Sequence, residues 1–453
     1  MGSKQNGVSK TFTGALVLDG NSPEDVARAM IENRQKESFF LLDLDEVCRR
    51  LDHFKEVMPR VEICYAMKAN DWEPILKLVI SQNIGFDCAS PGEIYKVLKL
   101  GASPTSIVFA LPTKTAYQMT YAREAGVKHT TFDSSYELKK LKQYWPDAHL
   151  LIRIRVDGEC IYKLGEKFGC DFETEAVALL EEAAALGLKV VGVAFHVGSA
   201  CSSVDSHAIG LQRARKLFDH EARAGRQMKI VDIGGGFMSD RTDRVDKVAQ
   251  QVNTALEEYF PERDVLVVAE PGRYVVDSAA TLYNSINNIR RVTKDNKPVN
   301  MIYLNDGLHG SMRYAEPWTT VEKLSIGQKN GVEIDQEELE EAILWGPTCD
   351  STDRIMEKAA IRLPRCSPFD WLVFKLQGAY TFVFHGPFSS IEIPLMRSVV
   401  SLELWNKIKD HPVFSPEDFV SNPDISAPLP STLPPKIHRD QINGFNASLL
   451  DKV

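Results

Sequence analysis

The sequence predicts an α/β protein, in which a closed (β/α)8 barrel is followed by a mainly antiparallel β domain. Eight short β-rich runs follow one another between residues 63 and 269, and the intervals between them have helix-forming composition. After Arg273 this alternation stops, which predicts the second domain. An open, doubly wound sheet is the competing architecture, but the count of eight runs favours the closed barrel.

The spacing of the eight runs is what a strand, a helix and two turns require. The first five recur about every 22 residues, and the others about every 35 to 40. One interval, residues 175–188, is rich in Ala, Leu and Glu and has Gly187 near its end, which is typical of a helix terminus. The predicted strands are 63–66, 85–88, 107–110, 130–132, 150–154, 190–196, 230–233 and 266–269.

The pattern divides the chain into three segments. Residues 36–275 are expected to form the barrel, and residues 276–420 together with 1–35 are expected to form the β domain. We expect residues 421–453 to be a flexible tail, because 422–435 is dense in Pro and Ser. The strand-like runs assigned to the β domain are 11–18, 299–304, 370–376, 380–385 and 391–395.

Composition argues against several classes of partner. A net charge of -9 gives no reason to expect nucleic acid or an anionic membrane. No run reaches the roughly eighteen consecutive apolar residues of a membrane span, and the first residues lack the apolar core of a signal peptide. The eight cysteines include no CxxC pair, so neither a zinc site nor a disulfide framework is indicated. We therefore expect a cytoplasmic protein without a metal, whose cysteines are mostly buried.

Chemically active residues cluster at the C-terminal ends of the predicted strands. Lys68 follows the first strand, Asp87 lies in the second, and His196 ends the sixth. Residues 234–236, all glycine, follow the seventh strand, and Glu270 follows the eighth. Barrel enzymes carry their catalytic residues at this end of the barrel, so these residues are expected to form one site.

Lys68 and His196 each allow two interpretations. A lysine at a strand exit is usually solvated, but it can also be an amine with a lowered pKa that bonds covalently to an aldehyde. A lone histidine is more often a core residue with satisfied hydrogen bonds. Beside Gly198 and Ser199, the His196 ring can instead stack on a cofactor, and the Ser199 hydroxyl can reach a phosphate.

The three glycines and Arg273 favour an anion site. Successive glycines allow positive φ and let backbone N–H groups point at one anion, although a plain tight turn is the alternative. The run is not a dinucleotide fingerprint, because the required third glycine spacing is absent. Phosphate loops recur after strands seven and eight of barrels, where this chain has the glycines and Arg273. Glu270 can form a surface ion pair with Arg273, or it can bind a pyridinium nitrogen.

These groups are the ones that pyridoxal 5'-phosphate (PLP) needs: a lysine for covalent attachment, a stacking ring, an anion cradle, and an acid beside an arginine. In the same order, the motifs resemble the eukaryotic ornithine decarboxylases, which are PLP-dependent group IV decarboxylases with an alanine-racemase-like fold. The resemblance extends over roughly residues 35–400. The runs that carry it are 66–71, 85–90, 167–169, 196–199, 234–237, 270–273, 305–307, 345–350 and 378–381.

The resemblance implies a homodimer with shared active sites that decarboxylates a small basic amino acid, by default L-ornithine to putrescine. It implies that Lys68 is the Schiff-base lysine, that His196 stacks on the ring and that Cys349 protonates the substrate carbon. Lys167 and Asp350 match residues that pair across the dimer interface. The implied cofactor residues are Lys68, Asp87, Arg153, His196, Ser199, Gly235, Gly236, Glu270, Arg273 and Tyr380, and the implied substrate residues are His309, Glu316, Trp318, Asp350 and Phe388.

The substrate side departs from the family pattern. His309 stands where the family has tyrosine, and the second aspartate that binds the terminal amine of ornithine falls on Trp318, or on Glu316 after a two-residue shift. Three hypotheses remain: an ornithine decarboxylase, a decarboxylase of lysine or a less basic amino acid, and a non-catalytic relative that binds antizyme, like the antizyme inhibitors. The retained cofactor residues disfavour the third hypothesis, and antizyme remains a candidate partner.

Overall fold

Eight parallel strands close into a barrel, as the sequence predicts. The computed structural model describes residues 14–239, 244–314, 319–324 and 338–430. Around the barrel the hydrogen-bonded order is β11, β12, β3, β4, β5, β6, β7 and β9. The strands are β3 (Val61–Ala66), β4 (Gly85–Cys88), β5 (Ile107–Phe109), β6 (His129–Phe132), β7 (His149–Ile154), β9 (Lys189–Phe195), β11 (Ile230–Asp232) and β12 (Leu266–Ala269). Each of them overlaps a predicted strand.

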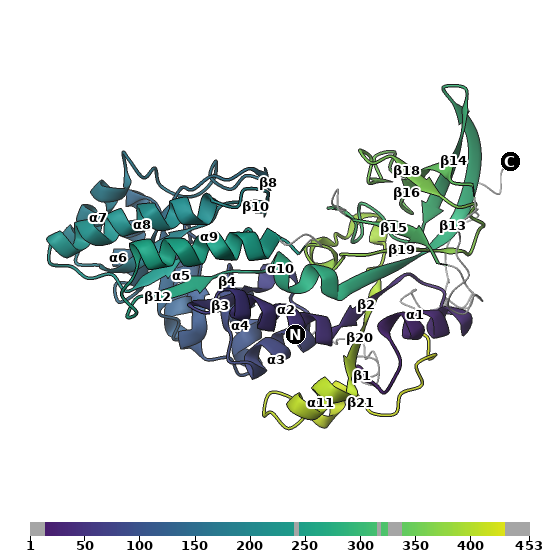
Figure 1. The fold of residues 1–453 in the computed structure, drawn as a ribbon, viewed down its shortest axis with the longest axis horizontal. Helices are drawn as coiled ribbons and strands as arrows, with labels where there is room; N and C mark the ends of the chain where they lie inside the picture. Colours follow the sequence, from purple (N-terminus) through teal and green to yellow (C-terminus); the bar gives the residue numbers. More distant parts are fainter. Residues whose placement is uncertain (1–13, 240–243, 315–318, 325–337, 431–453) are drawn as a thin grey trace, which may run out of the picture.

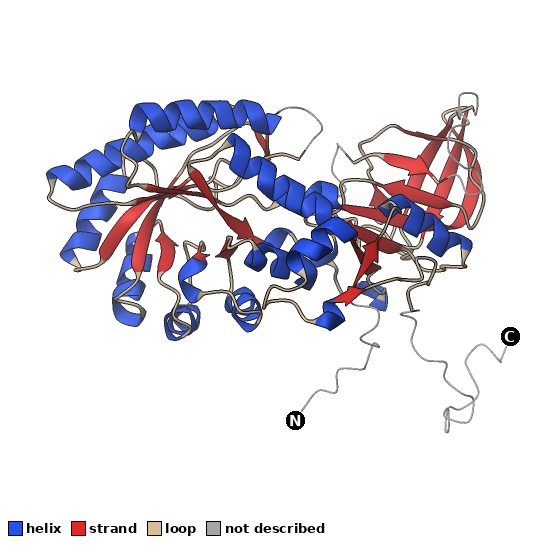
Figure 2. Ribbon diagram, turned by 60° about the horizontal axis from the view of Figure 1, so that its bottom comes forward, coloured by secondary structure: helices blue, strands red, loops and turns tan. Residues whose placement is uncertain are grey.

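Helices cover the outside of the barrel (Figure 2). Polar side chains cap some of them: the Ser90 hydroxyl accepts from the Glu93 amide at 3.2 Å, and Thr115 forms a capping box with Gln118. No helix of the described residues is both long and apolar enough to cross a membrane. The helices are α2 (Leu44–Val57), α3 (Glu73–Ser81), α4 (Pro91–Lys99), α5 (Ala116–Glu124), α6 (Ser135–Tyr144), α7 (Ala176–Ala185), α8 (Ser206–Arg223), α9 (Arg244–Tyr259) and α10 (Arg273–Val276).

The second lobe is built on one large sheet, which lies beside the barrel in Figure 1. Its main order is β17, β16, β14, β13, β2, β20, β1 and β21, and most of its strand pairs are antiparallel. Helices α1 (Pro23–Glu32) and α11 (Leu402–Ile408) belong to this part of the chain. The strands are β1 (Ala15–Leu18), β2 (Phe39–Asp43), β13 (Ala280–Lys294), β14 (Lys297–Leu304), β15 (Val321–Lys323), β16 (Glu340–Trp345), β17 (Arg354–Ile355), β18 (Ile361–Leu363), β19 (Trp371–Phe374), β20 (Leu395–Ser401) and β21 (Phe419–Val420).

Two predicted strands of the β domain are wrong. Residues 380–385 form a turn and a short 3-10 helix, because Tyr380 takes a left-handed φ of 58° and donates its backbone N–H to the Ala69 carbonyl at 2.9 Å. Residues 391–395 form a strand only from Leu395, after Pro394. In addition, β2 lies inside the segment that we assigned to the barrel, but it pairs with β13 and β20 in the sheet.

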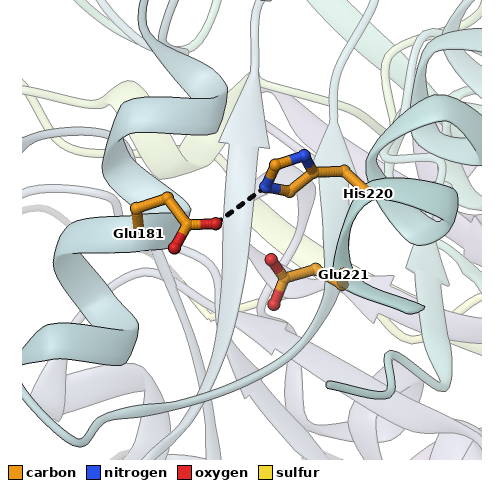
Figure 3. A group of neighbouring side chains, drawn as sticks. All are labelled: Glu181, His220 and Glu221. Atoms are coloured by element: carbon orange, nitrogen blue, oxygen red, sulfur yellow. Dashed lines mark hydrogen bonds and ion pairs between the residues drawn. The ribbon is translucent and has the colours of Figure 1, made fainter. Parts of the chain in front are cut away.

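Helices α7 and α8 are joined by a cluster of charged side chains (Figure 3). Glu181 of α7 faces His220 and Glu221 of α8, with 2.8 Å between Glu181 Oε1 and His220 Nε2. These three residues are close enough to suggest a metal site. However, the guanidinium of Arg226 donates to both carboxylates, at 2.6 Å to Glu181 and 2.7 Å to Glu221. Arg226 therefore supplies the positive charge, and the cluster is an ion-pair network between two helices.

Gly378 is where the β domain meets the barrel. Its backbone N–H donates to the Asp277 carbonyl at 3.0 Å, and its carbonyl accepts from Asn70 Nδ2 at 2.8 Å. A Cβ atom at this position would overlap the Val276 carbonyl oxygen. Only glycine therefore allows this close approach.

We predict that Gly378→Ala lowers the free energy of unfolding by about 1–3 kcal/mol, since the added methyl group has no space. Urea unfolding followed by circular dichroism measures this change. Gly386→Ala is the matched control, because a Cβ atom there meets no atom within 4 Å. An equal effect of the two substitutions would contradict the close approach.

Candidate active site

A cavity of about 410 Å³ lies at the C-terminal ends of the barrel strands. Seven of the predicted site residues line it, and they come from six barrel segments and one loop of the β domain: Lys68, Arg153, His196, Ser199, Glu270, Arg273 and Tyr380. The chain thus brings together residues that are more than 300 positions apart in the sequence. Their positions follow from the barrel, in which all eight parallel strands end on one face.

Lys68 lies two residues beyond the end of β3, in the 3-10 helix Met67–Ala69. Its ammonium group forms an ion pair with the carboxylate of Asp87 at the end of β4. Burial by itself lowers the pKa of Lys68, but the charges of Asp87 and Glu270 outweigh burial and raise it above the ordinary value. The expectation of a lowered pKa is therefore wrong for the free amine, because two neighbouring carboxylates stabilise its charge.

Three buried carboxylates cluster beside Lys68. Asp87 lies near the end of β4, Asp232 is the last residue of β11, and Glu270 follows β12. Burial, followed by the charge of Asp232, raises the pKa of Glu270 well above its usual range, and burial raises the pKa of Asp232 to about 6. Asp87 Oδ1 is buried without a hydrogen-bond partner among the described residues. The cluster therefore favours a cationic N–H donor in the cavity.

Asp232 is a site residue that the sequence analysis missed. It is the last residue of β11 and lies two residues before the first of the three glycines. The rule that selected Asp87 and Glu270 at the C-terminal ends of barrel strands could therefore also have found it. Its Oδ1 accepts from the Gly234 amide at 2.9 Å. Asp232 thus joins the acidic cluster to the glycine loop.

His196 is fixed with its ring against that glycine loop. Its Nδ1 accepts from the Gly198 amide at 3.1 Å, which leaves Nδ1 without a proton. Burial, followed by the charge of Arg153, lowers the pKa of His196 well below its usual range, so the ring is neutral. A Cβ atom at Gly235 would lie 2.8 Å from His196 Nε2, so the loop needs glycine where the ring packs.

The glycine loop is shaped for an anion. Gly234 and Gly236 have φ values of 64° and 107°, which glycine adopts without strain. The Gly235 carbonyl is held by buried His207, whose Nε2 lies 3.0 Å from it. Burial lowers the pKa of His207 to about 4, so that this histidine is a neutral structural donor. Such a fixed run of backbone amides is typical of a phosphate cradle.

Arg273 and Tyr380 complete this end of the cavity. The Arg273 guanidinium is buried at the start of α10, and its Cζ lies 4.9 Å from the centre of the Tyr380 ring. Tyr380 comes from the β domain, and its left-handed φ of 58° is held by the hydrogen bond to Ala69. The two lobes therefore both contribute to the anion site.

The predicted substrate residues lie elsewhere on the chain. Cys349 is exposed, and neither it nor Asp350 lines the cavity that contains Lys68. Asp350 instead binds His309 in the same chain, with 2.7 Å between Oδ2 and Nε2. The His309 ring packs against Phe388, with 4.4 Å between centroids. Glu316 and Trp318 lie outside the described residues.

The rest of the cavity wall is largely apolar, and the sequence analysis did not identify its residues as site residues. It comes from the segments after β4, β5 and β7 and from the β domain, where no regular spacing marks the residues. Of these residues, Ala89 and Phe168 belong to runs that carry the family resemblance. The wall residues are Ala89, Ala110, Leu111, Tyr162, Leu164, Phe168, Tyr314 and Phe384.

The residues present fit PLP. A glycine cradle with Ser199 and Arg273 suits the phosphate, the acidic cluster suits a protonated pyridine nitrogen, and Lys68 lies where an aldehyde can be bound. The buried Asp87 Oδ1 is the kind of polar atom that a ligand is expected to satisfy. Fold and site together define a PLP-dependent barrel enzyme.

Comparisons with known proteins give the same class. Residues 44–277 match the family described as "Pyridoxal-dependent decarboxylase, pyridoxal binding domain", and residues 273–378 match its "C-terminal sheet domain". The chain belongs to the pyridoxal-dependent decarboxylase family, and it is a PLP-dependent amino-acid decarboxylase.

Three relatives illustrate the range of the family. Ornithine decarboxylase 2 of Drosophila melanogaster is 37% identical over 362 residues, which are 79% of this chain and 90% of that protein. Antizyme inhibitor 2 of Xenopus laevis is 33% identical and covers 85% of this chain and 86% of its own length. The crystal structure of the Paramecium bursaria Chlorella virus arginine decarboxylase bound to agmatine superposes with a TM-score of 0.77 at 31% identity, covering 83% of this chain and 100% of that one.

We predict that Asp232→Asn stabilises the PLP-free protein at pH 7. The pKa of Asp232 rises from 3.8 to about 6 on folding, so the buried charge destabilises the folded state increasingly as the pH rises from 3.8 to 6. Asparagine keeps the acceptor for Gly234 and removes the charge. The gain in urea midpoint should therefore be larger at pH 7 than at pH 4.5. An equal gain at both pH values would contradict the raised pKa.

Proposed function

We propose that this enzyme decarboxylates a small L-amino acid to the corresponding amine with PLP bound at Lys68. The cavity supports this proposal most directly, since it gathers a lysine, an acidic cluster and an anion cradle on one barrel face. When bound, PLP supplies a ring that accepts the electron pair left on the substrate when CO2 departs. L-Ornithine, with putrescine as product, is the reference substrate because the curated relatives include ornithine decarboxylases.

In this proposal each residue has a limited task. Glu270 would hold a proton on the ring nitrogen, because a pyridinium charge beside it would compensate the buried carboxylate that burial and Asp232 disfavour. Neutral His196 would stack on the ring without adding charge. Arg273 and the glycine loop would hold the phosphate, and the Cys349 thiol would deliver a proton to the former α-carbon.

The position of Cys349 supports a dimer with shared sites. Cys349 and Asp350 lie between β16 and β17 and are absent from the lining of the Lys68 cavity in the same chain. A second copy of the chain could bring this loop to the open side of the cavity, as in an isologous dimer. One active site would then use Lys68 of one chain and Cys349 of the other.

The substrate side supports a second candidate, a decarboxylase of a less basic amino acid. Asp350 is the residue that we expect at the distal amine, but it accepts hydrogen bonds from His309 and Thr352. The backbone and side chain of Thr352, followed by His309, lower the pKa of Asp350. A carboxylate already bound in this way offers less to the ammonium group of ornithine. The apolar cavity wall likewise favours a less basic side chain.

The non-catalytic alternative is supported by one relative, antizyme inhibitor 2. A protein that only binds antizyme has no need of a PLP cavity. This chain retains Asp87, Arg153, Arg273 and Tyr380, and it arranges the last three around one cavity. We therefore favour the enzyme, and binding of antizyme remains a separate proposal for the same chain.

The first prediction for this function concerns substrate choice. We expect CO2 release from a panel of L-amino acids, with a less basic amino acid used at a higher kcat/KM than ornithine. The panel contains ornithine, lysine, arginine and neutral amino acids of similar length, and the amine products are identified by mass spectrometry. If ornithine is used best by a wide margin, the second candidate is wrong. If no acid releases CO2, the proposed decarboxylase is wrong.

The second prediction concerns His309. His309→Tyr removes the ring nitrogen that binds Asp350 Oδ2 and restores the residue that the family resemblance implies. We expect kcat/KM for ornithine to rise about tenfold, which corresponds to one charge-assisted hydrogen bond. Lys323→Arg, in β15, is a control on the same lobe that leaves Asp350 untouched. An unchanged ratio of kcat/KM for ornithine to kcat/KM for neutral amino acids would contradict the role given to His309.

The third prediction tests shared sites. Lys68→Ala and Cys349→Ala should each be nearly inactive. A mixture of the two variants should recover about a quarter of the wild-type activity. Half of the dimers are then mixed, and each mixed dimer has one intact site and one site that lacks both residues. The mixture is assayed after the subunits have exchanged. Activity that stays at the level of the separate variants would exclude a site built from two chains.

A further inference from the structure

Two cysteines face each other beside the active-site cavity. Strands β8 (Cys160–Tyr162) and β10 (Ser199–Cys201) form a separate two-stranded antiparallel sheet, and they lie together at one end of the barrel in Figure 1. The register places Cys160 directly opposite Cys201. Next to this pair, the Ser202 amide donates to the Glu159 carbonyl at 2.7 Å. The two thiols are therefore held as cross-strand neighbours by backbone hydrogen bonds.

The positions of the sulfur atoms fit a disulfide. Directly opposed residues of antiparallel strands have Cα atoms about 4.5–5.5 Å apart, which is within the range of about 4.4–6.8 Å for disulfides. Both sulfurs lie beside the same glycine: a Cβ atom at Gly158 would be 2.6 Å from Cys201 Sγ and 3.3 Å from Cys160 Sγ. Both thiols are free in this structure. No backbone rearrangement is needed before they can react with each other.

The two thiols differ in chemistry and in access. Cys160 is half-buried, and its thiol donates to the Val197 carbonyl at 2.9 Å, whereas Cys201 is buried. A hydrogen bond with Cys160 lowers the pKa of Cys201 to about 7 and raises the pKa of Cys160. Of the two thiols, Cys201 is therefore the one that ionises more readily, and Cys160 is its resolving thiol.

The pair is coupled to the cavity through both strands. Ser199, two residues before Cys201, lines the cavity, and so does Tyr162, two residues after Cys160. Cys160 Sγ also packs on Gly198, where a Cβ atom would lie 2.5 Å from the sulfur. A covalent bond between β8 and β10 would therefore join Tyr162 and the part of the cavity wall that it forms, called here the Tyr162 wall, to the strand that carries Ser199.

We propose that Cys160 and Cys201 form a reversible dithiol–disulfide pair, oxidised by hydrogen peroxide, that fixes the Tyr162 wall of the active-site cavity. The Cys201 thiolate attacks one peroxide oxygen, so that an S–O bond forms, the O–O bond breaks, and the hydroxide takes up a proton to become water. The Cys160 sulfur then attacks Cys201; the S–S bond forms, the S–O bond breaks, and the oxygen leaves with the Cys160 proton as a second water. Two electrons pass from the thiols to one peroxide.

Oxidation slows turnover in this proposal. The S–S bond would link the paired strands β8 and β10 covalently, and it would remove the freedom of Tyr162 to move as substrate enters and product leaves. A thiol reductant breaks the bond and restores that freedom. The effect on turnover rests on the proposed function, whereas formation of the disulfide does not.

The test uses the holoenzyme with its reductant removed. The enzyme is treated with an equimolar amount of hydrogen peroxide, alkylated and digested without reduction. We expect a peptide that links Cys160 to Cys201, two fewer free thiols per chain, and severalfold slower release of PLP to hydroxylamine, all reversed by dithiothreitol. Release of PLP is a second readout. Because exposed Cys349 also oxidises and the proposed dimer brings it to the cavity, the variants of Cys160 and Cys201, which retain Cys349, separate the effect of the pair from that of Cys349.

Cys160→Ser and Cys201→Ser should each abolish the linked peptide and the slower release of PLP, whereas Cys366→Ser, which alters a buried cysteine of the β domain, should keep both. Absence of the linked peptide from the wild-type digest would overturn the proposal, even if decarboxylation is confirmed. A linked peptide with unchanged PLP release would overturn the role of the pair at the cavity. An enzyme that decarboxylates no amino acid still gives the peptide map, so the two failures remain distinct.

Discussion

The site depends on one electrostatic constraint: Lys68 lies beside a cluster of buried carboxylates, of which Asp87 and Glu270 act on its charge and Asp232 acts on Glu270. The three lie at the C-terminal ends of separate barrel strands, and burial would make such a cluster costly without a compensating cation. The ammonium group of Lys68 supplies part of that compensation through its ion pair with Asp87. The carboxylates that Lys68 does not neutralise still need a cation. The N–H group of a protonated pyridine ring can supply it, so the cavity suits such a ring.

The barrel and the cofactor side could be predicted because their signals are local. Each strand is a short apolar run, and the residue that follows it takes its position from the geometry of the barrel. This is why Lys68, His196 and Glu270 were found from their place in the chain. Asp232 obeys the same rule, but its sequence neighbours, the three glycines, carry the stronger signal of an anion site.

The remaining parts could not be predicted because they depend on contacts between distant segments. Residues 380–385 have strand-like composition, but Tyr380 turns into a left-handed conformation to reach Ala69 of the barrel. The hydrogen bonds of Asp350 with His309, and the pairing of Cys160 with Cys201, likewise join residues some 40 positions apart. The raised pKa of Lys68 belongs to this group too, since it results from charges on two other strands.

The most direct test of the central claim is to locate the cofactor on the chain. The purified holoenzyme is reduced with sodium borohydride, which makes the bond between the lysine and PLP permanent, and is then digested and mapped by mass spectrometry. The account predicts a phosphopyridoxyl group on Lys68, and a loss of this label when Glu270 and Asp232 are both replaced by leucine. Label on a different lysine, or a folded protein that takes up no PLP, would contradict it.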